Sequence, residues 1–246
     1  MNKTVLITGS SRGIGKACIV EFAKHNYNVV INYVSNDNAA EELKSFIVEN
    51  YDVDVMLCKC DVSKEEKVKE MVNDVINHFG KIDVLVNNAG IAIDTTFEDK
   101  TVENFRKTLD VNLIGPFIVS KEVGKYMLEE KKGSIVNVSS TNGIDTYYTY
   151  SLDYDASKAG LISLTHNLAL EFSPYIRVNA VAPGWVNTEM NKELDKDYIK
   201  EECENIYLKK FAEPQEVAKA IYFLASDEAS YINNEVLRVD GGSNHQ

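Results

Sequence analysis

Short apolar stretches alternate with longer amphipathic stretches along most of this chain. The apolar stretches have the length of buried strands and lie at residues 5–7, 29–33, 53–58, 84–86, 134–138, 177–181 and 236–239. Between them, apolar residues recur with helical spacing, as in residues 16–25, 64–79, 101–128, 154–172 and 214–224. This alternation predicts a parallel sheet with helices on both faces, in which residues 236–239 form an edge strand.

The size and composition of the chain fit one ordinary globular domain. Its 246 residues can bury a substantial core, so we expect a single domain over residues 1–246. Hydrophobic residues make up 44% of the chain and charged residues 26%, without the repeats or low-complexity tracts that would indicate disorder. The predicted fold class is therefore α/β, with one doubly wound parallel sheet.

The charge and the apolar stretches argue against several kinds of partner. A formal net charge of −12 disfavours nonspecific binding to nucleic acid, which depends on basic patches. No apolar run approaches the length that crosses a membrane, and the first strand follows Met1 too closely for a secretion signal. We therefore expect a cytoplasmic protein that binds neither nucleic acid nor membrane.

No metal site is expected from the cysteines and histidines. The four cysteines, at positions 18, 58, 60 and 203, form no Cys-x-x-Cys pair, so we expect buried reduced thiols. The four histidines lie far apart in the sequence, and none has ligand spacing to another histidine or to a cysteine. Their spacing does not indicate a histidine-based catalytic triad either.

A glycine-rich loop, Thr8 to Gly15, separates the first strand from the first helix. Gly9, Gly13 and Gly15 allow a tight turn and a close approach of a ligand to the backbone. The helix that follows offers free N–H groups and the positive end of its dipole to a pyrophosphate. The spacing departs from the Gly-x-Gly-x-x-Gly fingerprint of dinucleotide-binding domains, so a purely structural turn remains an alternative.

The residues around the end of the second strand favour NADP(H) over NAD(H). An NAD-specific domain usually places a carboxylate here to bind the ribose 2′-hydroxyl, but residues 32 and 33 are not acidic. Arg12 in the glycine loop suits a 2′-phosphate instead, and Asn32 and Ser35 could add hydrogen bonds. Asp37 is the nearby acid that would argue for NAD(H). We expect NADP(H) to be preferred, with NAD(H) possible.

Tyr154 and Lys158 lie four residues apart where a helix is expected to begin. This spacing places both side chains on one face of the helix, close enough to touch. A neighbouring positive charge lowers the pKa of a tyrosine from its usual value of about 10, so that the phenol could exchange a proton with a carbonyl oxygen. The same spacing is common on helices by chance, and alone it does not establish a site.

Other polar residues stand at predicted strand ends or inside helices. Asp61 and Val62 follow the third strand, and residues 87–90 (Asn-Asn-Ala-Gly) follow the fourth, at the sheet edge where ligands of open α/β sheets bind. Asn112 lies among apolar neighbours shortly before Pro116, which predicts a kink. Asn112 could therefore lie at a local bulge whose backbone groups hold water, or could be a helix-interior amide with a partner of its own.

Together these residues resemble the short-chain dehydrogenase/reductase family along nearly the whole chain. The motifs occur in family order: Thr8-Gly-x-x-x-Gly-x-Gly15, Asp61-Val62, Asn87-Asn-Ala-Gly90, Asn112, Ser140, Tyr154-x-x-x-Lys158, Pro183-Gly184, Thr188 and Asp240-Gly-Gly242. The resemblance implies a Rossmann-type fold. It also implies a homotetramer that forms through the helices containing Asn112 and Tyr154.

The resemblance assigns a catalytic tetrad to Asn112, Ser140, Tyr154 and Lys158. Tyr154 would act as general acid in reduction and as general base in oxidation, while Ser140 would stabilise the substrate oxygen. Lys158 would lower the pKa of Tyr154 and hold the nicotinamide ribose. Asn112 would anchor a water that passes protons to Lys158, and the cofactor would carry the hydride.

The resemblance also implies which residues contact the cofactor. Asp61 and Val62 should border the adenine, and Thr188 should meet the nicotinamide amide. Thr8 and Asn87 are expected to be structural. The full expected set is Gly9, Ser11, Arg12, Gly13, Ile14, Gly15, Asn32, Ser35, Asp61, Val62, Asn88, Ala89, Gly90, Tyr154, Lys158, Pro183, Gly184, Val186 and Thr188.

Within the family, the closest likeness is to the 3-oxoacyl-acyl-carrier-protein reductases, through residues 10–15 and 177–184. The leading substrate is therefore a 3-oxoacyl thioester, which a carrier protein could present. The loop before Tyr154 departs from that group because it is one residue longer and carries Tyr147, Tyr148 and Tyr150. These tyrosines could stack on the ring of a sugar, polyol or steroid-like alcohol, or could only cover the pocket rim or a subunit contact.

Two further segments bear on the substrate. Lys131 and Lys132 are the remaining basic patch on which an acidic carrier protein could dock. Residues 187–210 are charged, and we expect them to form a helical flap that closes over the substrate. A dinucleotide-binding sensor without activity is a further alternative, but binding alone would not require a complete tetrad.

Overall fold

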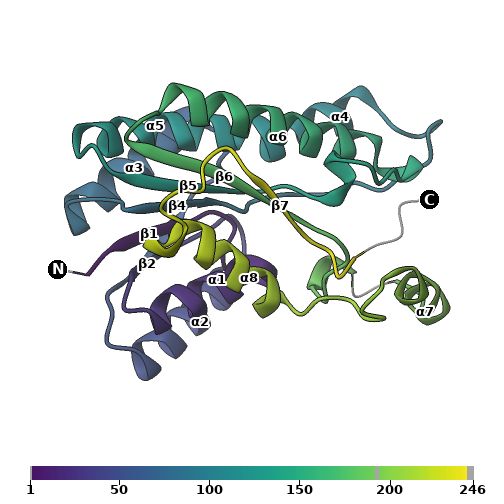
Figure 1. Ribbon diagram of the computed structural model, residues 1–246, viewed down its shortest axis with the longest axis horizontal. Helices are drawn as coiled ribbons and strands as arrows, with labels where there is room; N and C mark the ends of the chain where they lie inside the picture. The colour runs from purple at the N-terminus through teal and green to yellow at the C-terminus, as the bar shows by residue number, and fades with distance from the viewer. Residues whose placement is uncertain (1, 192–193, 243–246) are drawn as a thin grey trace.

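A computed structural model contains a seven-stranded parallel sheet between two layers of helices (Figure 1). It describes residues 2–191 and 194–242. The strands are ordered β3-β2-β1-β4-β5-β6-β7, as expected for a Rossmann-type sheet, and the last strand in sequence is an edge strand. Their bounds are Thr4–Ile7 (β1), Asn28–Tyr33 (β2), Val55–Lys59 (β3), Val84–Asn87 (β4), Gly133–Val138 (β5), Ile176–Pro183 (β6) and Val236–Val239 (β7).

Three helices cover each face of the sheet, as Figure 1 shows. One layer contains α1 (Gly13–Lys24), α2 (Asp37–Asn50) and α8 (Pro214–Ala225). The other contains α3 (Glu65–Phe79), α5 (Gly115–Glu129) and α6 (Leu152–Glu171), with the short α4 (Val102–Leu109) packed on α6. Helix α7 (Lys196–Asn205) lies apart from both layers, and single helical turns occupy Thr141–Gly143, Thr149–Ser151, Glu189–Asn191 and Asp227–Ala229.

The alternation of side chains along β1 explains the two-layered core. Val5 and Ile7 point to the cluster formed with α1, α2 and α8, whereas Leu6 points to the cluster formed with α3, α5 and α6. All three side chains are fully buried. A strand buried on both faces has no polar positions, which is why the central strands read as continuous apolar runs.

Several boundaries differ from those expected from the sequence. Helix α1 begins at Gly13, inside the glycine loop and three residues before Lys16. Helix α2 was not expected, because its buried stripe consists only of Ala40, Leu43 and Ile47. The predicted strand at 53–58 begins two residues later, at Val55.

The long run 101–128 is interrupted as Pro116 predicts. Helices α4 and α5 are joined by a π-helical segment, Asp110–Ile114, and Pro116 lies in the first turn of α5. Proline is tolerated there because the first N–H groups of a helix have no intrahelical partner. Asn112 lies in the middle of the π-helical segment, and π-bulges of this kind occur frequently at functional sites.

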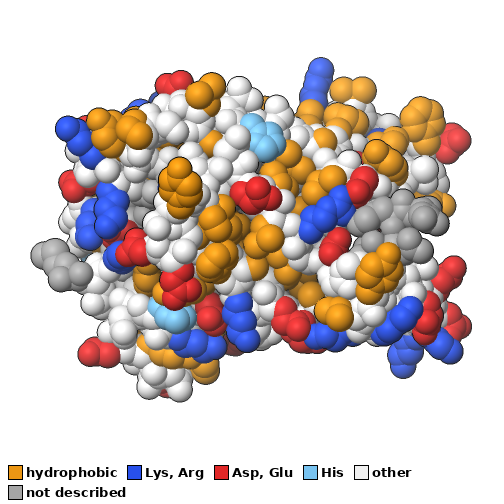
Figure 2. Space-filling model, viewed as in Figure 1, with side chains coloured by type: hydrophobic (Ala, Val, Ile, Leu, Met, Phe, Trp, Pro, Cys, Tyr) orange, Lys and Arg blue, Asp and Glu red, His pale blue; other side chains and the backbone are white. Residues whose placement is uncertain are grey.

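Hydrophobic side chains gather along the middle of the face in Figure 2, over the edge strand β7 and helix α8 of Figure 1, with charged side chains of both signs around them. Within residues 2–191 and 194–242, no helix is long and apolar enough to cross a membrane. The same residues contain no cluster of three or more His, Cys, Asp or Glu side chains that could hold a metal ion.

Candidate active site

Tyr154 and Lys158 lie one turn apart at the start of α6, above the carboxyl end of β5. The Lys158 Nζ lies 5.4 Å from the centroid of the Tyr154 ring and donates a hydrogen bond of 2.8 Å to the Val138 carbonyl. Lys158 is only 4% exposed, so its ammonium is held in one place by the last residue of β5. The predicted pairing of phenol and ammonium is therefore present.

Burial governs the protonation of this pair more than mutual attraction does. It raises the pKa of Tyr154 to about 12, although hydrogen bonding with Ser140 works in the opposite direction. It also lowers the pKa of Lys158 to about 8. The expectation that Lys158 depresses the pKa of Tyr154 below its usual value is therefore wrong for this structure, because removing the phenolate from water outweighs the nearby charge. At neutral pH Tyr154 is a neutral phenol, the form that donates a proton.

Ser140 lies immediately beyond β5 and is 7% exposed. Its Oγ accepts a hydrogen bond of 3.2 Å from the Asn142 N–H and donates one of 3.2 Å to the Asn142 Oδ1. The turn that follows packs directly on α6, since a Cβ at Gly143 would stand 2.6 Å from the Lys158 carbonyl carbon. Only glycine allows this approach, which keeps Ser140 within reach of the Tyr154 phenol.

Asn112 is fully buried in the π-helical segment, and its side chain bonds to two elements. The Oδ1 accepts a hydrogen bond of 2.8 Å from the Ile91 N–H, and the Nδ2 donates to the Ile91 carbonyl at 2.9 Å and to the Ser157 Oγ at 3.1 Å. A Cβ at Gly90 would lie 3.4 Å from the Asn112 Oδ1 and 3.6 Å from the Lys158 Nζ. Both sequence interpretations of Asn112 therefore hold, because it lies at a bulge and its amide has partners.

The glycine loop forms a cradle with no room for side chains. Gly9 has a φ of +62°, and a Cβ there would stand 2.8 Å from the Ala89 Cα. A Cβ at Gly15 would stand 2.6 Å from the Asn88 Nδ2, so only glycine lets α1 begin this close to the loop after β4. Helix α1 has no side-chain cap at Arg12, which leaves its first N–H groups for an anion. The cradle therefore fits the pyrophosphate of a dinucleotide.

Neutral side chains brace the cofactor loops from behind. The Thr8 Oγ1 accepts hydrogen bonds of 3.0 Å from the N–H groups of Asn88 and Ala89, and the Asn88 Nδ2 donates to the carbonyls of Thr8 and Gly9 at 2.9 and 3.0 Å. Asn87 donates to Ser120 and Asn137 inside the helical layer and the sheet. Thr8 and Asn87 thus have the structural positions expected of them, and Asn88 also acts as a brace.

Asn32 does not lie where a ribose ligand would be. Its side chain is 1% exposed, its Oδ1 accepts from the Gly9 N–H at 3.0 Å, and its Nδ2 donates to the Cys58 and Cys60 carbonyls. The prediction that Asn32 hydrogen-bonds the cofactor is therefore wrong, because the protein backbone uses its amide. Arg12 and Ser35 are exposed, as a contact to the ribose end would require.

The remaining predicted cofactor residues lie around the same edge of the sheet. Thr188 approaches the glycine loop, with its methyl group 3.5 Å from the Cβ position of Gly13. Val62 is buried against Gly115, whereas Asp61 accepts hydrogen bonds from the backbone and the hydroxyl of Ser63. The others also lie at this edge, partly or fully buried: Ser11, Ile14, Ala89, Gly90, Pro183, Gly184 and Val186.

Comparisons with known proteins agree with this geometry. A family model described as "Enoyl-(Acyl carrier protein) reductase" matches residues 9–244. A 3-oxoacyl-[acyl-carrier-protein] reductase FabG of Staphylococcus epidermidis is 38% identical over 247 residues, 98% of this chain and 99% of that protein. The chain belongs to the short-chain dehydrogenase/reductase family. It is therefore an oxidoreductase of a family that uses nicotinamide cofactors.

Other relatives within the short-chain dehydrogenase/reductase family differ in substrate. Glucose 1-dehydrogenase 2 of Bacillus subtilis is 37% identical over 98% of this chain and 94% of that protein. A solved structure titled "ElxO with NADP Bound" is 36% identical, covers 98% of both chains and superposes with a TM-score of 0.90. Identity at this level leaves the substrate of this short-chain dehydrogenase/reductase open.

The predicted flap, residues 187–210, carries α7 and docks through aromatic side chains; its residues 192 and 193 lie outside the described residues. Trp185 stacks on Phe211 with ring centroids 5.3 Å apart and donates from its Nε1 to the Glu202 Oε2 at 2.8 Å. Tyr198 packs edge-on against Trp185 at 6.0 Å. Burial and the nearby Glu202 raise the pKa of Tyr198 to about 12.

Lys131 and Lys132 do not lie near the catalytic tetrad. They directly precede β5, whereas Ser140 follows the same strand, so the full length of the strand separates them. Six residues of extended strand span about 20 Å. The expectation that these lysines form a docking patch for a carrier protein at this site is therefore wrong, because they lie at the amino end of the sheet.

Residues that sequence patterns did not single out also shape the site. Ser157 links Asn112 to the Tyr154 carbonyl, to which its Oγ donates at 2.7 Å. Asp153 and Asp155, on either side of Tyr154, each bind a different loop. Two carboxylates flanking the expected acid are visible in the sequence, but their partners come from distant segments.

Proposed function

We propose that this protein is an NADP(H)-dependent reductase that converts a carbonyl group to a secondary alcohol and can also catalyse the reverse reaction. The observation that carries the proposal is the convergence of Ser140, Tyr154 and Lys158 beside a glycine cradle. A neutral phenol, a buried hydroxyl and a held ammonium meet at the carboxyl end of β5. Binding of a dinucleotide alone would not need this set, which argues against a sensor without activity.

Tyr154 is the proton donor in this proposal. The substrate carbonyl oxygen accepts hydrogen bonds from the Ser140 and Tyr154 hydroxyls, which orient it and stabilise the charge that develops on it. Tyr154 then gives its proton to that oxygen, and in the reverse direction it takes the proton back. The bound nicotinamide supplies or accepts the hydride.

Lys158 and Asn112 support that proton transfer in the proposal. The Lys158 ammonium, held by Val138, stands over the Tyr154 ring, where it can hold the ribose of the nicotinamide and stabilise a phenolate once the proton has left. Asn112 fixes the loop at Ile91 and opens the helix at the π-helical segment, whose backbone groups can anchor a water that passes protons to Lys158.

Three observations support NADP(H) as the preferred cofactor. Arg12 is exposed at the start of α1, where it can pair with a 2′-phosphate. Asp37, the acid that would favour NAD(H), is instead bound by Lys59 at 2.8 and 3.0 Å. The related ElxO structure has NADP bound according to its title. NAD(H) remains a weaker alternative.

The leading substrate class is a 3-oxoacyl thioester, on the strength of the FabG relatives. A ring ketone or cyclic alcohol, as in a sugar, polyol or steroid, is the second candidate, and specific observations favour it. Tyr147, Tyr148 and Tyr150 are 81%, 37% and 45% exposed beside the site, and the basic patch for a carrier protein lies at the far end of β5. The glucose dehydrogenase relative is consistent with this second candidate.

A panel of ketones tests the proposal directly. Acetoacetyl thioester and cyclic ketones are each mixed with the protein and either NADPH or NADH, and cofactor oxidation is followed by absorbance. We expect turnover with at least one ketone and a preference for NADPH. A protein that oxidises neither cofactor with any member would contradict the proposed reaction, and a clear preference for NADH would contradict the role given to Arg12.

We also propose that the subunits form a homotetramer through the helices that contain Asn112 and Tyr154. Hydrophobic side chains in this layer are exposed in the single chain: Val102, Ile114, Phe117, Leu128 and Leu170. Burial of such side chains favours association. Light scattering on the purified protein tests this, and a monomeric mass at micromolar concentration would contradict it.

A further inference from the structure

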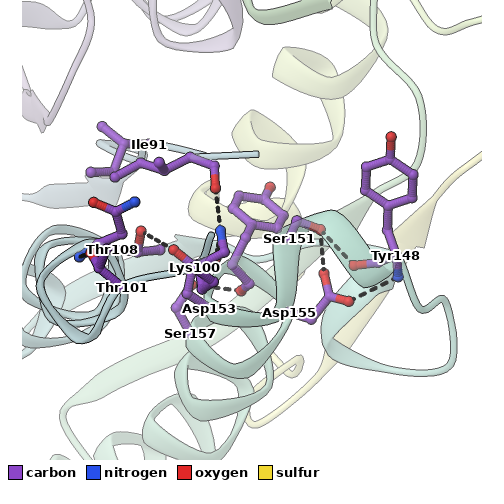
Figure 3. A network of polar contacts seen from close by, with 12 residues as sticks. Ile91, Lys100, Thr101, Thr108, Tyr148, Ser151, Asp153, Asp155 and Ser157 are labelled. Carbon is purple, nitrogen blue, oxygen red and sulfur yellow. Dashed lines mark hydrogen bonds and ion pairs between the residues drawn. The ribbon is translucent and has the colours of Figure 1, made fainter. Parts of the chain in front are cut away.

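Two carboxylates flank Tyr154 and leave α6 in opposite directions. Asp153 and Asp155 are two residues apart on a helix, so their side chains point about 200° away from each other around its axis. Figure 3 shows Lys100, Thr108 and Asp153 on one side of α6 and Tyr148 beside Asp155 on the other. The inference below rests on the proposed function, because it concerns the walls around the proton donor.

Asp153 ties α6 to the segment that follows β4. Its side chain is completely buried and forms an ion pair of 2.8 Å with Lys100, whose side chain is only 5% exposed. The Thr108 hydroxyl donates to the other carboxylate oxygen at 2.6 Å. Burial favours the neutral acid, but these hydrogen bonds hold the pKa of Asp153 below its usual range. A charged, fully partnered carboxylate is therefore fixed next to Tyr154.

Lys100 extends this contact to one wall of the site. Its ammonium also donates to the Ile93 carbonyl, while the Asn112 amide binds both backbone groups of Ile91. The segment Ile91–Ile93 is thus held at one end by the tetrad and at the other by Lys100. Since buried ion pairs add little stability compared with apolar packing, precise positioning is the better explanation of this pair.

Asp155 holds the opposite wall. Its Oδ1 accepts from the Asn142 Nδ2 at 2.7 Å and from the Ser151 hydroxyl at 3.1 Å, and its Oδ2 accepts from the Tyr148 N–H at 3.0 Å. One carboxylate therefore gathers both ends of the loop between Ser140 and α6. This is the loop that carries the exposed tyrosines.

The two walls are joined to each other away from α6. The Thr95 N–H donates to the Tyr150 carbonyl at 3.1 Å, which connects the segment after β4 to the tyrosine loop. The contacts run from Asp153 through Lys100 to residues 93–95, then across to residues 148–151 and back to Asp155. The result is a closed ring that begins and ends on the two neighbours of Tyr154.

We propose that Asp153 and Asp155 are positioning residues that fix this ring around Tyr154 and so set the width of the substrate entrance. Neither carboxylate needs to touch the substrate. Because the ring is closed, loosening either side should loosen the other as well. A contact that only stabilised the local fold would not have this property.

Hydrogen–deuterium exchange on the cofactor-free protein tests the ring without relying on activity. The variants are Lys100→Met, Asp155→Asn and the milder Thr108→Val, with Lys3→Met as control because Lys3 pairs with Asp227 on a distant, exposed part of the surface. We expect Lys100→Met to speed exchange at residues 148–151 and Asp155→Asn to speed exchange at residues 91–95, with no change in Lys3→Met. Faster exchange confined to the mutated side would overturn the proposal.

Steady-state kinetics over ketones of increasing size give the second readout. We expect each ring variant to raise the KM for the best ketone by about tenfold or more, with unchanged NADPH affinity, and Lys100→Arg to recover part of the loss. Wild-type KM values in Lys100→Met and Asp155→Asn would overturn the proposal. If Lys100→Met does not fold, Thr108→Val decides by the same criteria. If the wild-type protein reduces no ketone, the proposed function fails, but the exchange data still decide whether the ring exists.

Discussion

The cofactor side and the substrate side of this site are held together in different ways. On the cofactor side, the neutral side chains of Thr8, Asn32 and Asn88 bond to loop backbone and are largely buried. On the substrate side, the carboxylates of Asp153 and Asp155 hold the loops, and aromatic side chains such as Tyr147 stay exposed. Backbone braces keep the cofactor loops constant, whereas charged anchors and exposed rings can vary between relatives without disturbing the sheet.

The largest expected effect concerns Ser140, at the boundary of the two sides. Replacing Ser140 with Ala removes a donor to the substrate oxygen, so we expect kcat to fall by about 10²–10³-fold while NADPH affinity is unchanged. Ser139→Ala is the matched control, because its Oγ donates only to the Lys158 carbonyl. That control should cost about 1 kcal/mol of unfolding free energy and little kcat. Equal losses of kcat in the two variants would contradict the role of Ser140.

Lys158 provides a test in which activity and stability move in opposite directions. Burial lowers its pKa from 10.5 to about 8, so the buried charge destabilises the folded state fully below pH 8. This penalty shrinks as the pH rises from 8 towards 10.5, because the folded protein then carries the neutral amine. Lys158→Met should therefore raise the unfolding free energy at pH 7 by on the order of 3 kcal/mol, and the gain should shrink above pH 8.

Urea unfolding of the wild type and Lys158→Met between pH 6 and 10 measures this difference. The same variant should lose most of its turnover, since the ammonium beside Tyr154 is gone. A gain in stability that does not change with pH, or a loss at pH 7, would show that burial of the charge is not the main cost at this position.

Arg12 tests the cofactor side alone. A hydrogen bond to a charged group contributes about 1.5–3 kcal/mol, so Arg12→Leu should raise the KM for NADPH by about 10–100-fold and leave that for NADH nearly unchanged. Lys16→Leu, one turn further along α1 and also exposed, is the control for general loss of positive charge. If both variants weaken NADPH equally, Arg12 does not contact the 2′-phosphate.

The smallest expected effect concerns the contact between Trp185 and α7. Glu202→Gln replaces the acceptor of the Trp185 N–H by a neutral group, so we expect the KM for the ketone to rise only a few-fold, since a hydrogen bond contributes about 0.5–1.5 kcal/mol. Glu201→Gln, at the exposed neighbouring position, should leave the KM unchanged. A fall in kcat without a change in KM would argue against a role of α7 in holding the substrate.

The sequence predicted the parts of the molecule that depend on local patterns. The strand alternation, the glycine loop and the bulge near Asn112 are confirmed, because buried strands, tight turns and Pro116 each leave a local signature. Asn32 was misplaced because strand periodicity cannot show that its amide faces the Cys58 and Cys60 carbonyls.

Other features depend on how distant segments pack. Ser63 is followed by an acidic first turn, yet its hydroxyl bonds to Asp61 and not to the start of α3. Lys100 and Asp153 are 53 positions apart and meet only when α4 packs on α6. The pKa of Tyr154 likewise depends on burial, which the four-residue spacing to Lys158 does not reveal.

The most direct test of the central claim compares the wild type with Tyr154→Phe on the ketone that the wild type reduces fastest. NADPH binding is measured by fluorescence and turnover by NADPH oxidation. The account predicts unchanged NADPH affinity and a kcat lower by about 10²–10⁴-fold, because only the proton donor is lost. A variant that turns over as fast as the wild type would contradict the assignment of Tyr154 as the acid.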